Sequence, residues 1–266
     1  MGCRIAIRVR LAAPTLNDSA RRGGVSGRWR QGVARKMAAA STTAPVEAVL
    51  FDMDGVLVSS DRISRLAARD VLKDLYAIDV DPEEFLAYTG MGEGVFLAGV
   101  AKAHGVEIDV DRTKAAFFET YLAKYCDGSE NISFPGAVEL VKACKNAGLK
   151  VAVASAADYI KVQGNLAAGR IDIGLFDAVI SADQFVGKLK PNPDIFLAAG
   201  EALGVAPAHC VVIEDAIAGI EAARRAGMRV IGVSTTMSAE DLLGAAYTPD
   251  MVRDSIGAIQ LDELIN

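Results

Sequence analysis

Two carboxylates, Asp52 and Asp54, stand two positions apart at the end of a short apolar run, Val46–Phe51. The run is partly β-branched and predicts a buried strand, so both acids follow its carboxyl end, where open α/β sheets bind ligands. Two acids this close resist ionising together unless a cation neutralises them or one keeps a proton. The pair therefore indicates a divalent metal and phosphoryl chemistry with one acid as nucleophile. A calcium loop does not fit, because residues 55–57 offer no further side-chain oxygen.

Three further segments carry polar side chains where predicted strands end. Ser155 closes one apolar run, and Lys190 lies in a loop stiffened by two prolines. Glu214 and Asp215 close a third run. Each has a structural alternative, because Ser155 or Asp215 could cap the next helix and Lys190 could be a solvated loop charge. These alternatives do not explain why complementary charges all follow strands, so we expect the groups to meet in one crevice.

The rest of the pattern predicts the elements that position these residues. Residues 60–130 carry apolar side chains at helical spacing and no convincing strand, which predicts a helical module. After residue 134, strands expected at 150–155, 177–181, 210–213 and 229–233 alternate with helices, among them 137–147, 194–203 and 217–226. This alternation predicts an α/β fold, a Rossmann-like parallel sheet with helices on both faces. The helical module is then an insert, which divides the sheet domain into residues 45–59 and 131–266.

Composition narrows the class of protein. The chain has 266 residues, of which 52% are hydrophobic, enough for a large core. No apolar stretch approaches the roughly 20 residues of a membrane span. Residues 1–44 hold nine Lys and Arg against one acid, and the remaining 19 basic and 33 acidic residues give a net charge of −14. A body this acidic is not expected to bind nucleic acid.

The basic leader, residues 1–44, has the composition of an organelle transit peptide. It is rich in Arg, Ser, Thr, Gly and Ala, and it lacks the long apolar stretch of a secretory signal. A disordered basic tail, or translation from Met37, is the alternative. Composition alone does not separate the mitochondrion from the chloroplast.

The cysteines and histidines are expected to be structural. Cys126, Cys144 and Cys210 follow the leader without metal-site spacing, so neither a disulfide framework nor a zinc site is expected, although Cys126 could be a regulatory thiol. His104 and His209 lie away from the acidic motifs.

These motifs together resemble those of the haloacid dehalogenase-like hydrolase superfamily, in its β-phosphoglucomutase-like branch, which has a helical cap after the first strand. The resemblance covers about residues 46–235. It rests on Asp52 and Asp54 in Asp-Met-Asp-Gly, on Ser155, on Lys190 in Lys-Pro-Asn-Pro-Asp, and on the Glu214-Asp215 pair. Within that branch the chain is similar to the hydrolase domain of a plant thylakoid protein, which favours the chloroplast over the mitochondrion or the cytoplasm.

The resemblance implies a role for each motif residue. Asp52 is expected to attack phosphorus, and Asp54 to act as general acid and then general base. Mg²⁺ is expected on Asp52, the backbone carbonyl of Asp54, and Asp215, with Glu214 helping directly or through water. Ser155 and Lys190 are expected to bind the phosphoryl oxygens, and Lys190 also offsets the charge of Asp52.

The cap loop separates this chain from the sugar-phosphate mutases that it resembles. Its glycine-rich segment, with Gly90 and Glu93, falls at the family's substrate-specificity loop, although a flexible interhelical turn is an equal alternative. Glu93 stands where the mutases have an arginine that grips a second phosphate, and Ser64 where they have a histidine. Ser59-Ser60 also departs from the common pattern. The first two differences argue against a mutase.

The sequence therefore predicts an enzyme: a Mg²⁺-dependent phosphatase, a phosphoric monoester hydrolase. Its expected substrate is a small phosphorylated metabolite of the sugar phosphate or phosphoglycolate type, and the reaction passes through an aspartyl-phosphate. The alternatives are a phosphomutase of the β-phosphoglucomutase type and a non-catalytic module that senses a ligand. No motif indicates an oligomeric state.

Overall fold

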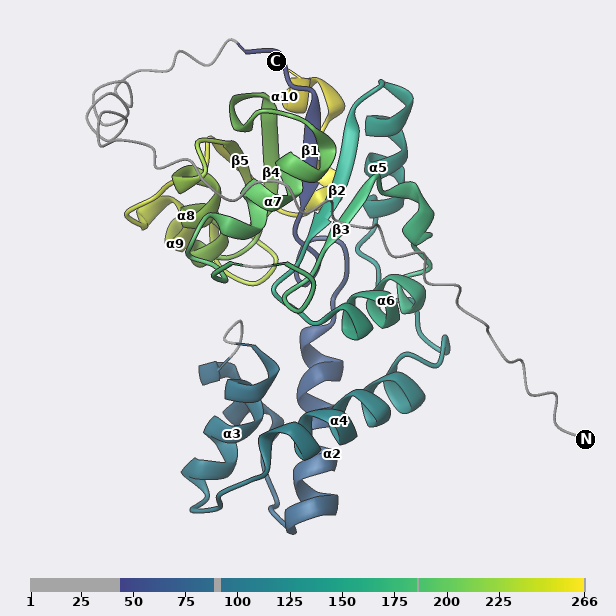
Figure 1. Cartoon of the computed structure of the whole chain (residues 1–266), viewed down its shortest axis with the longest axis vertical. Helices are drawn as coiled ribbons and strands as arrows, with labels where there is room; N and C mark the ends of the chain where they lie inside the picture. Colours follow the sequence, from purple (N-terminus) through teal and green to yellow (C-terminus); the bar gives the residue numbers. More distant parts are fainter. Residues whose placement is uncertain (1–43, 89–91, 186, 266) are drawn as a thin grey trace, which may run out of the picture. The chain divides into compact units, whose positions relative to one another are not determined.

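The structure is a computed structural model, and it describes residues 44–88, 92–185 and 187–265 (Figure 1). These residues belong to one compact unit, 43–266. The predicted leader, 1–44, lies outside them except for its last residue, so the transit peptide stays a prediction.

The described strands form one parallel sheet in the order β3-β2-β1-β4-β5-β6. They are β1 (Ala48–Phe51), β2 (Lys150–Ala154), β3 (Ala178–Ile180), β4 (Cys210–Glu214), β5 (Arg229–Val233) and β6 (Met251–Arg253). Leu50 of β1 is in register with Ala152 of β2 and Val212 of β4. The chain builds outward on the β2 side of β1 and then continues on the β4 side. Ligands of open α/β sheets bind at such a switch point, beyond the strands' carboxyl ends.

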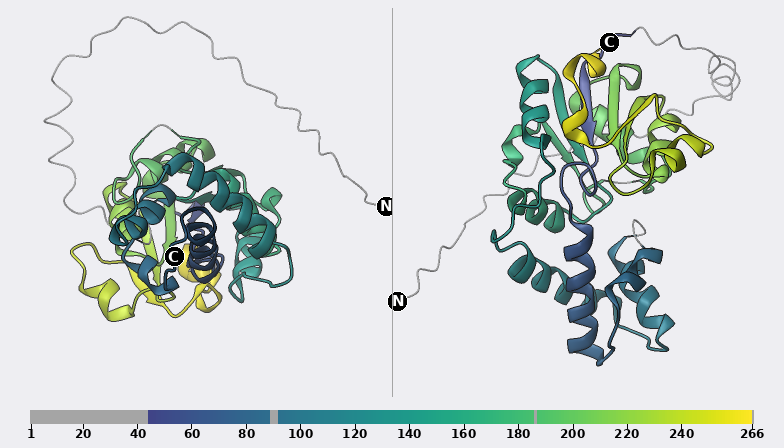
Figure 2. Two further views of the ribbon diagram at one scale, coloured as in Figure 1. Left: turned by 90° about the horizontal axis from the view of Figure 1, so that it is seen from below. Right: turned by 180° about the vertical axis from the view of Figure 1, so that it is seen from behind.

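Helices cover both faces of this sheet (Figures 1 and 2). Because side chains alternate along a strand, Val49 and Phe51 of β1 join one apolar cluster while Ala48 and Leu50 join another. The first cluster includes residues of α5 (Ala137–Asn146), α6 (Tyr159–Ala168) and α10 (Leu261–Ile265). The second includes residues of α7 (Asp194–Leu203), α8 (Ile217–Arg225) and α9 (Ala239–Gly244). The predicted α/β class, with a parallel sheet between helices, is confirmed.

Residues between β1 and α5 form the helical region predicted from the sequence. It contains α2 (Asp61–Tyr76), the 3-10 helix η1 (Pro82–Tyr88), α3 (Glu93–Ala103), α4 (Val110–Thr120) and the π-helix η2 (Tyr121–Tyr125). Its aromatic rings pack on one another, with Phe117 contacting Phe96, Phe118 and Tyr121. This arrangement is consistent with a cap, and Figure 1 shows the cap helices beyond the edge of the sheet where β1 ends.

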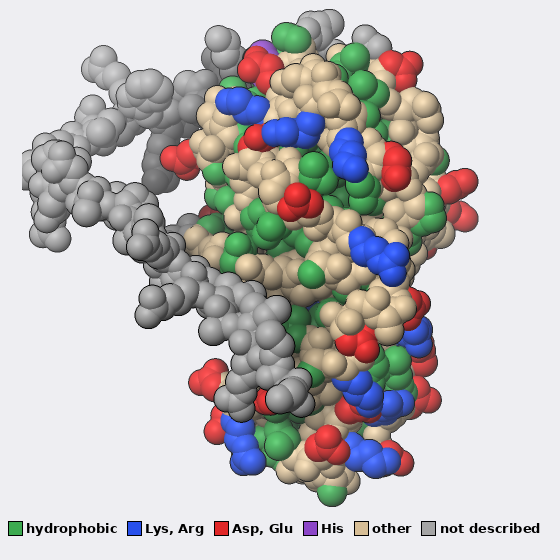
Figure 3. Space-filling model, turned by 90° about the vertical axis from the view of Figure 1, so that its right-hand side faces the viewer, with side chains coloured by type: hydrophobic (Ala, Val, Ile, Leu, Met, Phe, Trp, Pro, Cys, Tyr) green, Lys and Arg blue, Asp and Glu red, His purple; other side chains and the backbone are tan. Residues whose placement is uncertain are grey.

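Short 3-10 helices complete the core: η3 (Ile173–Leu175), η4 (Pro207–His209) and η5 (Ile256–Ala258). No helix among the described residues has the length and apolar character needed to cross a membrane. On the face shown in Figure 3, acidic and basic side chains are interspersed over both core and cap. That face offers no extended patch of one charge.

Candidate active site

Three buried carboxylates meet where β1 and β4 end. Asp52 follows β1 directly, Glu214 is the last residue of β4, and Asp215 comes next. One carboxylate oxygen from each lies within 4.8 Å of the others. The three residues are only 7%, 1% and 4% exposed. Adjacent parallel strands thus bring together two acidic motifs that are about 160 positions apart in the sequence.

The amine of Lys190 neutralises part of this acidic group. It donates to Asp52 Oδ1 at 2.5 Å and to Glu214 Oε1 at 2.6 Å. Its side chain is 9% exposed, so the alternative of a solvated loop charge is wrong. The second oxygen of Glu214 accepts hydrogen bonds from the backbone N–H groups of Asp215 and Ala216, at 2.7 and 3.0 Å. Both oxygens of Glu214 are therefore engaged.

Burial dominates the ionisation of the acidic group. It raises the pKa of Asp52 to about 8, against the opposing effect of Lys190 and with a further rise from Glu214. Burial also raises the pKa of Asp215 well above its usual value, and Glu214 and Asp52 add to that rise. Three carboxylates around one ammonium leave a formal charge of −2. A divalent cation with oxygen ligands would remove that cost, and Mg²⁺ prefers such ligands.

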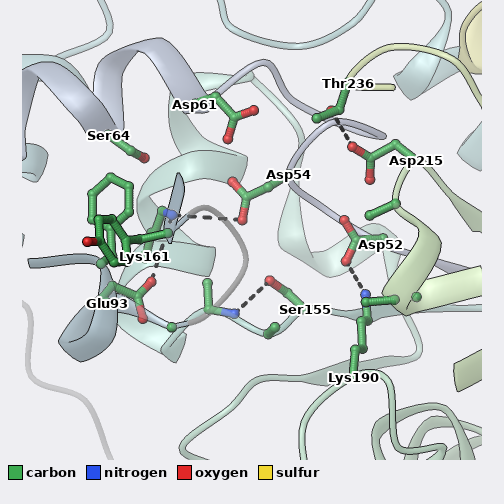
Figure 4. Close-up of a pocket in the computed structure, with 18 of the residues that line it drawn as sticks. Asp52, Asp54, Asp61, Ser64, Glu93, Ser155, Lys161, Lys190, Asp215 and Thr236 are labelled. Carbon is green, nitrogen blue, oxygen red and sulfur yellow. Dashed lines mark hydrogen bonds and ion pairs between the residues drawn. The ribbon is translucent and has the colours of Figure 1, made fainter. Parts of the chain in front are cut away.

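Asp54 is held apart from the three acids by its own set of partners. Its Oδ1 accepts hydrogen bonds from Ser60 Oγ and from Asn165 Nδ2, the latter at 2.8 Å. Asn165 is oriented in turn by the Tyr121 hydroxyl, which donates to its Oδ1 at 2.5 Å. Lys161 Nζ lies 3.9 Å from Asp54 Oδ2. These contacts leave the carboxyl group of Asp54 in the space between core and cap (Figure 4).

Sequence reasoning missed Asn165, Lys161 and Tyr121. A signal existed for the first two, because they stand four positions apart on a helix that follows the Ser155 motif, and such residues share a helix face. Tyr121 lies in the π-helix η2, and no sequence pattern predicted this short helix. Ser60, noted only as a departure from the common pattern, donates to Asp54.

The capping alternatives for Ser155 and Asp215 are wrong. Ser155 follows β2 and is 1% exposed, and its Oγ accepts from the N–H of Ala157 at 3.1 Å, while Asp158 occupies the N-cap position of α6. Asp215 accepts a hydrogen bond from Thr236, and α8 has Ala216 at its N-cap. Both residues line the same cavity as Asp52.

Two glycines allow the backbone to approach the acids closely. Gly55 has φ +88°, and a Cβ there would lie 2.0 Å from Asp215 Oδ2. A Cβ on Gly219 would lie 1.7 Å from Glu214 Oε1. Any side chain at either position would displace a carboxylate. Steric crowding therefore explains why a glycine follows the first acidic pair.

A cavity of about 340 Å³ connects the acidic group with the cap (Figure 4). The core contributes the motif residues, and α6 contributes Lys161. The cap contributes Asp61, Ser64, Arg65, Tyr88 and Glu93. Glu93 is thus at the cavity as expected, whereas Gly90 lies outside the described residues. The structure brings Asp52, Asp54, Ser155, Lys190, Glu214 and Asp215 together around this cavity.

The other candidate residues lie elsewhere. His104 contacts Glu84 at 2.8 Å, and His209 Nδ1 contacts the backbone oxygen of Pro45 at 2.8 Å. Cys126, Cys144 and Cys210 are free. Burial raises the pKa of the Cys126 thiol to about 11, which disfavours the reactive thiolate that a regulatory role requires.

Comparison with known proteins agrees with this geometry. Residues 46–227 match the family model "haloacid dehalogenase-like hydrolase", which is more than half of the chain. The chain is 52% identical over 221 residues to the protein SUPPRESSOR OF QUENCHING 1, chloroplastic, of Arabidopsis thaliana. This match covers 83% of the chain but only 21% of that much longer protein.

Two shorter relatives match over nearly their whole length. The fructose-1-phosphate phosphatase YqaB of Escherichia coli is 31% identical over 188 residues, 70% of this chain and 95% of that protein. The crystal structure of CbbY from Rhodobacter sphaeroides in complex with phosphate superposes with a TM-score of 0.70 at 27% identity. It covers 82% of this chain and 99% of that one. The resemblance expected from the motifs is therefore confirmed, and the chain belongs to the haloacid dehalogenase-like hydrolases.

Proposed function

We propose that this chain is a Mg²⁺-dependent phosphatase that hydrolyses a small phosphorylated metabolite, with Asp52 as the nucleophile. The observation that carries the proposal is the contact of Lys190 with Asp52, beside the carboxylates of Glu214 and Asp215. A nucleophilic carboxylate, an amine for phosphoryl oxygens and an acidic cation site lie in one buried cluster. The cavity volume, about 340 Å³, is at the low end of the range for small-molecule sites, which suits a small metabolite.

In the first step, a carboxylate oxygen of Asp52 attacks phosphorus as the ester P–O bond breaks. Asp54 gives its proton to the departing alcohol oxygen. In the second step, Asp54 takes a proton from water, the water oxygen attacks phosphorus, and the bond to Asp52 breaks to release phosphate. Lys190 and Ser155 bind the phosphoryl oxygens during both steps.

The donor set of Asp52, Asp215 and the backbone carbonyl of Asp54 fits Mg²⁺, which prefers oxygen ligands and retains waters. When bound, the ion neutralises charge and lets an anionic ester approach an anionic nucleophile. Glu214 belongs to the same acidic group, but its two oxygens already accept from Lys190 and from two backbone amides. Its contacts support a role in orienting Lys190 beside the cation.

Domain roles complete the proposal. Residues 45–59 and 131–266 form the hydrolase core, residues 60–130 form a cap that carries specificity through Gly90 and Glu93, and residues 1–44 direct the chain to the chloroplast. The chloroplastic relative supports this location. A phosphomutase is disfavoured, because Glu93 adds a carboxylate where a second phosphate would need a cation. Intact motif residues argue against a non-catalytic module.

The test is phosphate release from a panel of small phosphate esters, of the sugar phosphate and phosphoglycolate types, with Mg²⁺ and with a chelator. We expect turnover only with Mg²⁺, and its loss in Asp52→Asn while the fold is retained. The matched control is Asp74→Asn, on an exposed turn of α2. Turnover that persists in Asp52→Asn overturns the assigned nucleophile.

A further inference from the structure

The cap side of the cavity carries a second set of polar groups that the phosphoryl chemistry does not use. Asp61, Ser64 and Arg65 all line the cavity from α2. Their spacing, i, i+3 and i+4, places them on one face of the helix. Figure 4 shows the side chains of Asp61 and Ser64 beside the space that Asp54 enters. One helix thus offers a carboxylate, a hydroxyl and a guanidinium to whatever lies beyond the phosphoryl group.

One atom on each of two of these side chains lacks a hydrogen-bond partner. Ser64 Oγ and Arg65 Nε are the buried side-chain polar atoms, among the described residues, that have no hydrogen-bond partner. Ser64 is 6% exposed. A buried polar group without a partner is destabilising, and native proteins contain few of them. Both atoms belong to residues that line the cavity.

The cations on this side are already paired. Lys161 Nζ lies 3.8 Å from Glu93 Oε1 and 3.9 Å from Asp54 Oδ2. Arg65 pairs through Nη2 with Glu83 at 3.3 Å, so its charge already faces a carboxylate. Asp61 and Glu93 add carboxylates to the same wall. Among the described residues that line this wall, both cations thus already face carboxylates, which disfavours a second phosphoryl group or a carboxylate there.

The remaining lining on this side is apolar. Phe96 and Phe117 contribute rings, and Tyr88 adds a ring with a hydroxyl. Aromatic faces suit the C–H surfaces of a short carbon chain, whereas the α2 stripe suits hydroxyl groups that both donate and accept.

We propose that Asp61, Ser64 and Arg65 form a subsite for the uncharged, hydroxyl-bearing part of a short polyol or sugar monophosphate. Building on the proposed function, this subsite favours a hydroxylated leaving group over one that ends in a carboxylate or a second phosphate. It therefore separates the two substrate types, sugar phosphate and phosphoglycolate, in favour of the first.

Substrate pairs that differ in one group provide the test. The first pair is 2-hydroxyethyl phosphate and 2-phosphoglycolate, and the second is fructose 1-phosphate and fructose 1,6-bisphosphate, with p-nitrophenyl phosphate as a generic ester. We expect kcat/KM to be at least about tenfold higher for the less charged member of each pair. Equal or reversed preferences, with p-nitrophenyl phosphate still hydrolysed, overturn the subsite. Failure to hydrolyse any ester with Mg²⁺ overturns the proposed function instead.

Variants of α2 residues test whether their side chains cause this substrate preference. In Ser64→Ala, the ratio of kcat/KM for fructose 1-phosphate to that for p-nitrophenyl phosphate should fall about tenfold. In Asp61→Asn, the relative rate on 2-phosphoglycolate should rise. Ser129→Ala, in an exposed loop, is the matched control and should leave both ratios unchanged. Ratios unchanged in both α2 variants contradict the subsite.

Binding provides a readout independent of turnover. With Mg²⁺ and the Asp52→Asn variant, 2-hydroxyethyl phosphate should raise the melting temperature more than 2-phosphoglycolate does at equal concentration. If Ser64→Ala fails to fold, this comparison and Asp61→Asn still decide the question. A larger shift with 2-phosphoglycolate overturns the proposal.

Discussion

Asp54 is oriented by a chain of neutral groups that crosses from cap to core. The Tyr121 hydroxyl donates to Asn165, and the Asn165 amide donates to Asp54. Asn165 and Tyr121 are both 0% exposed, so water does not compete for these contacts. The role proposed for Asp54, to give and then take a proton, depends on its orientation, because proton transfer requires hydrogen-bond distance to the reacting oxygen. Asn165 is therefore a positioning residue for Asp54.

We predict that Asn165→Leu lowers kcat by about 10- to 100-fold and changes KM much less, because substrate contacts remain while Asp54 loses its donor. Steady-state kinetics across a pH range measures both parameters and detects any change in the acid limb of the profile. Gln163→Leu, on the exposed side of the same helix, is the control and should behave as the unmodified chain does. An unchanged kcat in a folded Asn165→Leu variant would contradict the positioning role.

Lys190 provides the second prediction at this scale. Lys190→Met removes the ammonium that contacts Asp52 and Glu214, and leaves two buried acids without their cation. Removing one preorganised charge at a reacting centre costs about 10²–10³ in kcat, and we expect a loss of that size. Lys188→Met, two positions away and exposed, should retain activity. Comparable losses in both variants, measured as initial rates of phosphate release, would refute a specific role for Lys190.

Asp52, Ser155, Glu214 and Asp215 could be predicted from sequence because each ends a strand or follows one directly. Once Asp52, Ser155 and Asp215 are placed after buried parallel strands, sheet geometry alone brings them to one edge. Ser64 and Asn165 could not be placed in this way. Whether a helical residue meets the cavity depends on the rotation and docking of its helix against another domain, which local spacing does not encode.

The cap is stabilised at the element scale by contacts between its first and last helices. Asp70 of α2 accepts hydrogen bonds from Lys124 and Tyr125 of η2, and also pairs with Arg69. Partial burial alone would raise the pKa of Asp70, but the hydrogen bonds from these neighbours outweigh it and lower the pKa to about 2. The ionised carboxylate of Asp70 therefore links α2 to η2, the first and last helices of the cap.

We predict that Asp70→Asn lowers the free energy of unfolding by about 1–2 kcal/mol at neutral pH. Because the folded-state pKa is depressed, this contribution is fully present above the unfolded value of 3.8 and is lost as the pH falls toward 2. Urea unfolding at pH 7 and at pH 3.5 measures the gap between the variant and the unmodified chain, which should narrow at the lower pH. Asp74→Asn serves as control, and a gap that widens on acidification would contradict the assignment.

Element boundaries were predicted best where apolar periodicity is strong. The helix expected at 194–203 is α7 as observed, and the strand expected at 229–233 is β5. The short elements β6, α9 and α10 were not anticipated. Three to six residues carry too little periodicity to distinguish from a loop, and β6 forms because β5 offers it a free sheet edge.

At the scale of the whole molecule, charge links the proposed cation site to stability. Asp52, Glu214 and Asp215 lie together against the single amine of Lys190, and they are buried. This cluster is formed only when β1 and β4 pair, so the unfolded chain offers no equivalent site. A cation that binds the folded state alone shifts the unfolding equilibrium by mass action.

We therefore predict that Mg²⁺ at about 100 times its dissociation constant stabilises the chain by roughly 2.7 kcal/mol. For a protein of this size, that is an increase of about 5–10 °C in the melting temperature. In Asp215→Asn the increase should be largely lost, because one of the three carboxylates is replaced by a neutral amide. Thermal unfolding with Mg²⁺, and with Na⁺ at matched ionic strength, separates specific binding from screening. An equal rise in melting temperature with Na⁺, or with Mg²⁺ in Asp215→Asn, would contradict this prediction. It would mean that these acids do not hold Mg²⁺, and that the folded arrangement of the site does not depend on Mg²⁺.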